Sequence, residues 1–304
     1  MVGSILTATT QDTGPERVYD PLLNRYSYFV AFAALLVLAA GAAVASLARP
    51  IAPAAGAVVP PAAVTFEAWH QWGAVVVALL ILGQAVWATK LGISAREAAH
   101  YSWMALGAFL VEALLGLSAS IRSLSPLTDI LHALLGAIAF ALIYAVAVVT
   151  SRRWQEGPSF IEDTWRPSLR TLAMVLPAVV LLQITLGAAF RYRAASVLWH
   201  ILNAMVVLLL VLIVCIFLIR QFPAHPSLRP VSIALAGITS VQVFLGFATF
   251  LMLLLFPESS LQVIIFSVLH VANGALTLSA TASLSLEIRR NAIDAVTYRS
   301  LTAR

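Results

Sequence analysis

Charged residues are scarce in this sequence. Asp, Glu, Lys and Arg make up 10% of its 304 residues, and hydrophobic residues make up 61%. A soluble globular domain has about a quarter of its residues charged. Together with a mean hydropathy of +0.95, this composition excludes a soluble domain and indicates a polytopic protein of the lipid bilayer. The net charge of +5 comes from basic residues between apolar runs, where they set membrane topology, so we expect no nucleic-acid partner.

Cysteine is nearly absent as well. The chain has a single cysteine, Cys215, and it lies inside an apolar run. One cysteine forms no internal disulfide, and it excludes metal sites that need several thiolates. We therefore expect Cys215 to pack in a helical core.

Long apolar runs are what the sequence has in abundance. A membrane-spanning helix needs about 17–25 apolar residues, and irregular backbone is not tolerated in lipid. Eight runs meet this length, which predicts an all-α membrane protein with eight transmembrane helices. The runs are Tyr28–Leu47, Phe66–Thr89, Tyr101–Ala119, Ile130–Thr150, Leu172–Phe190, Val197–Ile219, Val231–Phe256 and Leu261–Leu286.

The basic residues predict the orientation of these helices. With the N-terminus in the cytoplasm, 14 of the 18 Lys and Arg residues fall on the cytoplasmic side. The four that fall outside are Arg49, Arg122, Arg191 and Arg193. Cytoplasmic loops are enriched in Lys and Arg, so the pattern predicts a multi-pass protein of the inner cell membrane with both termini cytoplasmic.

A polar connection at residues 151–171 divides the chain into two similar halves. Each half contains four apolar runs and two helix histidines. We expect two pseudo-symmetric four-helix bundles, residues 28–150 and 172–286. A cytoplasmic segment, 1–27, precedes them, and a cytoplasmic tail, 287–304, follows.

Every second helix carries one histidine in its outer third to half. These are His70, His132, His200 and His270, and they share a similar depth toward the extracytoplasmic side. Ionisable groups inside membrane helices usually face a cavity, a partner or a cofactor. Imidazoles from two facing helices can hold haem iron. A zinc or copper site usually requires further ligands, and no other ligand residue repeats at this depth. The pattern predicts haem bound by paired histidines.

Small residues recur around these histidines. Gly116, Gly187 and Gly246 each follow a Glu or Gln by four residues on the helix before a histidine helix, and the first run keeps Gly41. Two interpretations stay open for these glycines: close packing of helices, or contact with a flat ligand. A small residue also lies four positions after each histidine, where we expect it to make room for a macrocycle; these are Ala74, Gly136, Ala204 and Gly274.

Other polar residues have two interpretations each. Glu67, one turn before His70, either interacts with the helix N-terminus or provides a carboxylate at the edge of a haem. The outer arginines Arg122, Arg191 and Arg193 either bind haem propionates or extend to the membrane surface. His100 and His225 are interpreted as ordinary solvated histidines that bind no metal.

Taken together, the eight helices, the histidines on the even helices, the repeat and the Glu67-x-x-His70 motif resemble the heme A synthase family over about residues 28–286. The resemblance implies oxidation of the haem O methyl group to the formyl of haem A, for assembly of a terminal oxidase. His70 and His132 would line the substrate-haem site, with Glu67 catalytic, and His200 and His270 would ligate haem b. The haem substrate would come from a haem O-forming enzyme; the electron donor and a homo-oligomeric state stay open.

The sequence also departs from the usual family pattern. Gln71 stands where the family usually has Arg, and the first outer loop has no cysteine pair. A second function therefore stays open: a di-haem b membrane protein that transfers electrons from quinol without oxygenase activity.

Overall fold

Eight long helices form the body of the protein. The computed structural model describes residues 5–7, 19–47, 61–121 and 125–302. All eight helices are long and apolar enough to cross a membrane, which confirms the all-α polytopic membrane fold. In the N-terminal half they are α1 (Pro21–Leu47), α2 (Pro61–Lys90), α3 (Arg96–Ile121) and α4 (Pro126–Val149); in the C-terminal half they are α6 (Leu169–Arg191), α7 (Val197–Gln221), α8 (Leu228–Leu255) and α9 (Leu261–Asn291).

Local sequence signals explain where the helices begin. Pro21, Pro61 and Pro126 occupy first helical positions, where proline loses no hydrogen bond. Asp20 caps α1, because its Oδ1 accepts from the backbone N–H groups of Leu22 and Leu23 at 2.9 and 3.1 Å. The start of α2 at Pro61 is one turn earlier than its apolar run predicts, so Glu67 lies beyond the first turn.

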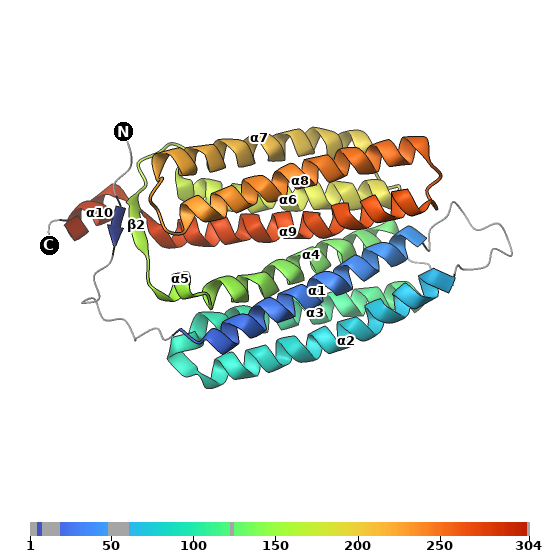
Figure 1. Cartoon of the computed structure of the whole chain (residues 1–304), viewed down its shortest axis with the longest axis horizontal. Coiled ribbons are helices and arrows are strands. Elements are labelled where there is room, and N and C mark those ends of the chain that lie inside the picture. Colours follow the sequence, from blue (N-terminus) through green and yellow to red (C-terminus); the bar gives the residue numbers. More distant parts are fainter. Residues whose placement is uncertain (1–4, 8–18, 48–60, 122–124, 303–304) are drawn as a thin grey trace.

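The helices form two rings of four that pack side by side (Figure 1). In each ring, consecutive helices contact one another, and α1–α4 and α6–α9 contacts close the rings. Helices α2 and α4 are therefore diagonal in one ring, and α7 and α9 in the other. Helix α9 also packs on α1 and α4, and α4 on α6, which joins the halves. Cys215 is fully buried in the core of the C-terminal half, as predicted.

A small sheet lies at the end of the molecule where both termini are found (Figure 1). Strand β2 (Ser159–Glu162), in the connection between the halves, pairs antiparallel with β1 (Ile5–Thr7) and parallel with β3 (Ala292–Ile293). From the sequence, a plain polar connection is expected here. Instead it carries the central strand, which holds segments from near both ends of the chain. A 3₁₀ turn, η1 (Gly92–Ala95), and short helices α5 (Arg152–Gln155) and α10 (Ala295–Thr302) complete the described elements.

Trp154 fixes the connection to both halves. Its Nε1 donates to Glu97 Oε2 of α3 at 2.6 Å, and the Arg290 guanidinium of α9 lies over its ring, 4.3 Å from the centroid. The side chain is 5% exposed. Packing of this kind, with a cation over an aromatic face, stabilises the junction between the bundles.

Candidate paired-histidine sites

The diagonal helices bring the four predicted histidines together in two pairs. The ring centroids of His70 and His132 are 6.1 Å apart, with an interplanar angle of 87°. The centroids of His200 and His270 are also 6.1 Å apart, with an angle of 81°. The two halves that repeat in the sequence therefore also place their histidines at the same separation, with one pair inside each ring of helices.

A carbonyl oxygen of the preceding long helix lies beside Nδ1 of each histidine. Nδ1 of His70 lies 2.9 Å from the carbonyl oxygen of Val37, and Nδ1 of His132 and His200 lies 3.2 Å from those of Glu112 and Gln183. His270 also forms a hydrogen bond with the backbone of Gln242. A carbonyl only accepts, so at His70 and His132 Nδ1 carries the proton and Nε2 keeps the lone pair that a metal ion requires.

A glycine supports each imidazole from behind. A Cβ atom added at Gly41, Gly116, Gly187 or Gly246 would lie 2.7, 2.7, 2.8 or 3.0 Å from Cε1 of its histidine, too close for a normal contact. The group packed on each glycine is an imidazole, and the contact with a flat ligand stays a prediction. These glycines therefore allow each imidazole ring to approach the backbone of the neighbouring helix closely.

Two of the small residues after the histidines lie against side chains of the preceding helix, and their role beside a macrocycle stays a prediction. The position of a Cβ at Gly136 lies 3.5 Å from Glu112 Oε1, and that at Gly274 lies 3.3 Å from Gln242 Nε2. The space beside these glycines is filled by side chains of the preceding helix. It makes room for Glu112 and Gln242 to reach the histidines.

In the C-terminal half each histidine is part of an amide network. Nε2 of Gln183 lies 3.1 and 3.2 Å from the two ring nitrogens of His200, and Oε1 accepts from Asn203 Nδ2 at 2.8 Å. Gln242 and Asn273 repeat this arrangement at His270, with 3.2, 3.5 and 2.8 Å. The asparagine fixes the orientation of the glutamine amide. Each glutamine is then the group that a metal ion would displace from Nε2.

The asparagines are site residues that the sequence analysis missed. Asn203 and Asn273 each follow a histidine by three residues, so both lie on the histidine's face of the helix. The repeated His-x-x-Asn pattern was the available signal. The N-terminal half has Gly73 and Leu135 at the equivalent positions.

An acid replaces the amide in the N-terminal half. Glu112 Oε1 lies 3.2 Å from His132 Nδ1, and the Glu112 side chain is 12% exposed. In the sequence, Glu112 stands out only as a member of the repeat. A carboxylate beside the Nδ1–H of a metal-binding histidine increases the basicity of the ligand. This contact is the clearest chemical difference between the two sites.

Three of the other predicted site residues form polar contacts of their own. Glu67 is partly exposed and accepts a hydrogen bond from Gln71 Nε2 at 3.2 Å. Arg191 Nη2 donates to Ser46 Oγ of α1 at 2.8 Å, and the exposed Arg193 side chain lies 3.9 Å from Glu258. Arg122 lies outside the described residues. The proposed roles of Glu67 in catalysis and of the arginines at propionates stay predictions.

Of the two remaining histidines, one is buried although it was expected to be solvated. His100 is exposed, as expected, but His225 is only 2% exposed. His225 Nε2 donates to the Ser159 carbonyl oxygen at 2.9 Å, and Nδ1 accepts from the backbone N–H groups of Ser227 and Leu228 at 3.2 and 3.1 Å. It caps the start of α8 and connects it to β2, which a solvated histidine would not do.

The two imidazoles of each pair are close together, with 6.1 Å between ring centroids. His70 with His132, and His200 with His270, are the residues that would hold haem iron, which would supply redox chemistry there. Within the described ranges no three His, Cys, Asp or Glu side chains gather as a metal site, and haem iron would need only the two histidines.

In comparisons with known proteins, the chain matches no protein-family model and no curated sequence.

Proposed function

We propose that this chain is a di-haem membrane oxidoreductase of the heme A synthase type. The observation that carries the proposal is the matched geometry of the two histidine pairs, with 6.1 Å between centroids in both halves. The backbone contacts of Nδ1 leave Nε2 of His70 and His132 available for iron, and at His200 and His270 iron would replace the glutamine amide beside Nε2. Haem iron supplies one-electron and oxygen chemistry when it is bound.

The difference between the halves supports different roles for them. His70 and His132 would bind the substrate, haem O, and its product, haem A, whereas His200 and His270 would bind haem b. Two acids lie near the N-terminal pair. Glu67 is one turn before His70 on α2, and Glu112 Oε1 lies 3.2 Å from His132 Nδ1. A carboxyl group there can hold or move a proton, which the carboxamides of the C-terminal half cannot do at ordinary pH.

The surroundings of the sites are part of the same proposal. In the inner cell membrane, the positive-inside rule would place the histidine sites toward the extracytoplasmic face. The haem substrate would arrive from a haem O-forming enzyme, and the product would serve terminal oxidase assembly.

The direct test is the haem that the protein contains. Purified protein is expected to show haem b together with haem O or haem A in the pyridine haemochrome of extracted haem. Glu67→Ala should abolish formation of haem A and leave haem b bound. Glu156→Ala, which removes an exposed acid paired with Arg152, serves as the control and should behave like wild type. Normal accumulation of haem A in the Glu67→Ala variant would rule out a catalytic role for Glu67.

A second candidate function follows from the equal centroid distances of the two histidine pairs. A di-haem b protein that transfers electrons would use the same histidines and need no acid at Glu67. It would release only haem b on extraction, and Glu67→Ala would change nothing. The extracted haem type therefore separates the two functions.

A further inference from the structure

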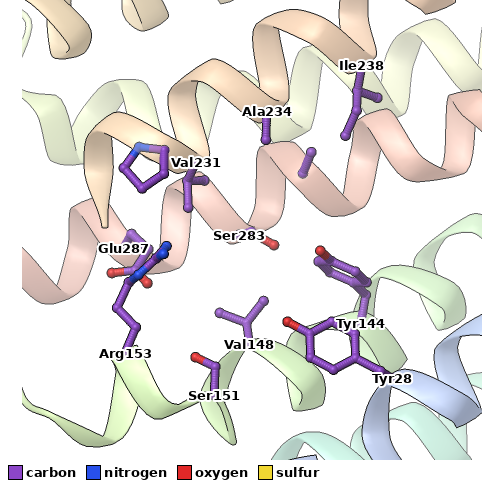
Figure 2. A pocket seen from close by; sticks show the side chains of 12 residues that line it. Tyr28, Tyr144, Val148, Ser151, Arg153, Val231, Ala234, Ile238, Ser283 and Glu287 are labelled. Carbon is purple, nitrogen blue, oxygen red and sulfur yellow. The ribbon is translucent and has the colours of Figure 1, made fainter. Parts of the chain in front are cut away.

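A polar pocket lies between the two halves, away from the histidine pairs. It has a volume of about 370 Å³, and its walls come from α1, α4, α8 and α9 and from the residues after α4 (Figure 2). Tyr144 lies twelve residues after His132 on α4, and Ser283 lies thirteen after His270 on α9. At 1.5 Å per residue these are separations of about 18–20 Å along the helices. The pocket is thus near the end of the molecule that carries the termini.

One end of the pocket carries a buried acid next to a base. Glu287 is 3% exposed, and its Oε2 accepts from Asn291 Nδ2 at 3.0 Å. The Arg153 side chain extends beside it (Figure 2). Burial of an isolated carboxylate is costly, so a nearby cation and hydrogen-bond donors are needed to hold it. This end of the pocket therefore presents both a hydrogen-bond donor, Arg153, and an acceptor, Glu287.

Two tyrosine hydroxyls line another part of the pocket. The rings of Tyr28 and Tyr144 pack edge to face, with centroids 6.4 Å apart, and both hydroxyls face the cavity (Figure 2). Neither hydroxyl forms a hydrogen bond with another residue in the described part of the chain. Both are therefore available to a bound molecule.

The remaining wall is apolar and lies mainly on α8. Val231, Ala234 and Ile238 follow one another on the same face of this helix, and Ala280 of α9 lies near them. The alanine side chains leave room for a flat group. Together with the polar ends, this wall suits an amphiphile with a ring and an apolar tail that enters from the membrane.

From these contacts we propose that the pocket binds the ring of a membrane-soluble quinol or quinone. Such a ring is flat and uncharged and carries oxygen atoms on opposite sides, which can meet the tyrosine hydroxyls and the Arg153–Glu287 pair together. A phospholipid headgroup fits less well, because its phosphate would face the carboxylate of Glu287. The proposal concerns binding alone and does not depend on haem in either half.

The pocket wall is connected to the C-terminal histidine site by hydrogen bonds. The carbonyl oxygen of Ile238 accepts from Asn273 Nδ2 at 3.1 Å, and Asn273 also holds Gln242, whose amide reaches His270. A ligand that displaces this turn of α8 would alter the hydrogen bonding of His270.

The test is a titration of the full-length protein in lipid nanodiscs with decyl-benzoquinone, followed by calorimetry with empty nanodiscs subtracted. We expect saturable binding of about one molecule per chain. Ala234→Phe fills the pocket and should weaken binding at least tenfold. Tyr144→Phe keeps the ring but removes one hydrogen bond, and should weaken binding about fivefold.

The control is Ile233→Phe, a similar enlargement on α8 at a residue that is 47% exposed and lies outside the pocket. It should bind as wild type does. Equal affinity in wild type and Ala234→Phe, or displacement of the quinone by anionic phospholipid at ordinary membrane content, would overturn the proposal. Haem-free protein prepared from His132→Ala/His270→Ala should still bind, so a failure of the haem assignment is distinguishable from a failure of this one.

Discussion

The glycine behind each imidazole is the most constrained type of residue in the sites. At Gly116 a Cβ would lie 2.7 Å from His132 Cε1, whereas at Gly107, on the same helix, it would meet nothing within 4 Å. A methyl group at residue 116 must therefore displace the ring of His132, because the backbone of α3 is held by its neighbours.

Gly116→Ala is accordingly expected to lower haem affinity in the N-terminal half about 10–100-fold, the usual effect of misplacing a metal ligand. Gly107→Ala should leave haem binding unchanged and add up to about 1 kcal/mol of helix stability. Haem content per chain and thermal unfolding measure both effects. Equal haem retention in the two variants would show that the glycine contact does not position His132.

Glu112 is the residue through which the two sites should differ in redox potential. A carboxylate beside the Nδ1–H of His132 stabilises the oxidised metal more than an amide does, so Glu112→Gln should raise the potential of the N-terminal haem. A difference of about 1.5 kcal/mol corresponds to about 60 mV for one electron. Spectroelectrochemical titration measures this shift.

The reciprocal change serves as the control. Gln242→Glu should lower the potential of the C-terminal haem by a similar amount and leave the other unchanged. Unaltered potentials in both variants would contradict a tuning role for these side chains.

Among the structural elements, the connection between α7 and α8 should respond to acid. Burial lowers the pKa of His225 below its ordinary value near 6.5, and the hydrogen bond to the Ser159 carbonyl opposes only part of this shift. The neutral ring uses Nδ1 as an acceptor, which protonation removes. The unfolded chain takes up this proton at higher pH than the folded chain does, so the stabilising contribution is present above about pH 6.5 and lost as pH falls below it.

Hydrogen exchange of residues 222–228 is therefore expected to accelerate between pH 7 and pH 5, after correction for the intrinsic rate. His225→Gln should remove most of this pH dependence. His100→Gln, which changes an exposed histidine, should retain it. A pH response that persists unchanged in the His225 variant would assign the effect to another group.

The helices were predictable from sequence to within about two turns, the largest difference being the start of α1 at Pro21 instead of Tyr28, because the length and hydropathy of a spanning helix are fixed by the bilayer. The histidine pairs followed from the repeat. The three strands were not predictable, since they have two to four residues each and pair across more than 100 residues of sequence. The contacts of Glu112 and of the four glycines also escaped prediction, because they depend on the rotation of one helix against the next.

For the molecule as a whole, the two rings of helices should bind haem independently. The pairs lie in separate bundles, and variants at distant sites usually act additively. His132→Ala and His270→Ala should each reduce the haem-to-protein ratio from two to one, and the double variant should reduce it to zero. Pyridine haemochrome assays on purified protein measure the ratio. Loss of both haems from either single variant would show that the halves are coupled.

The three-stranded sheet has a consequence for how the chain matures. Strand β2 precedes the entire second bundle, yet its partner β3 follows directly after α9. During synthesis, β2 must therefore wait, with one edge unpaired, until the last spanning helix has entered the bilayer. Closure of that edge by β3 requires that α9 is complete, so a chain that stops before α9 would keep an open strand edge that the finished protein lacks.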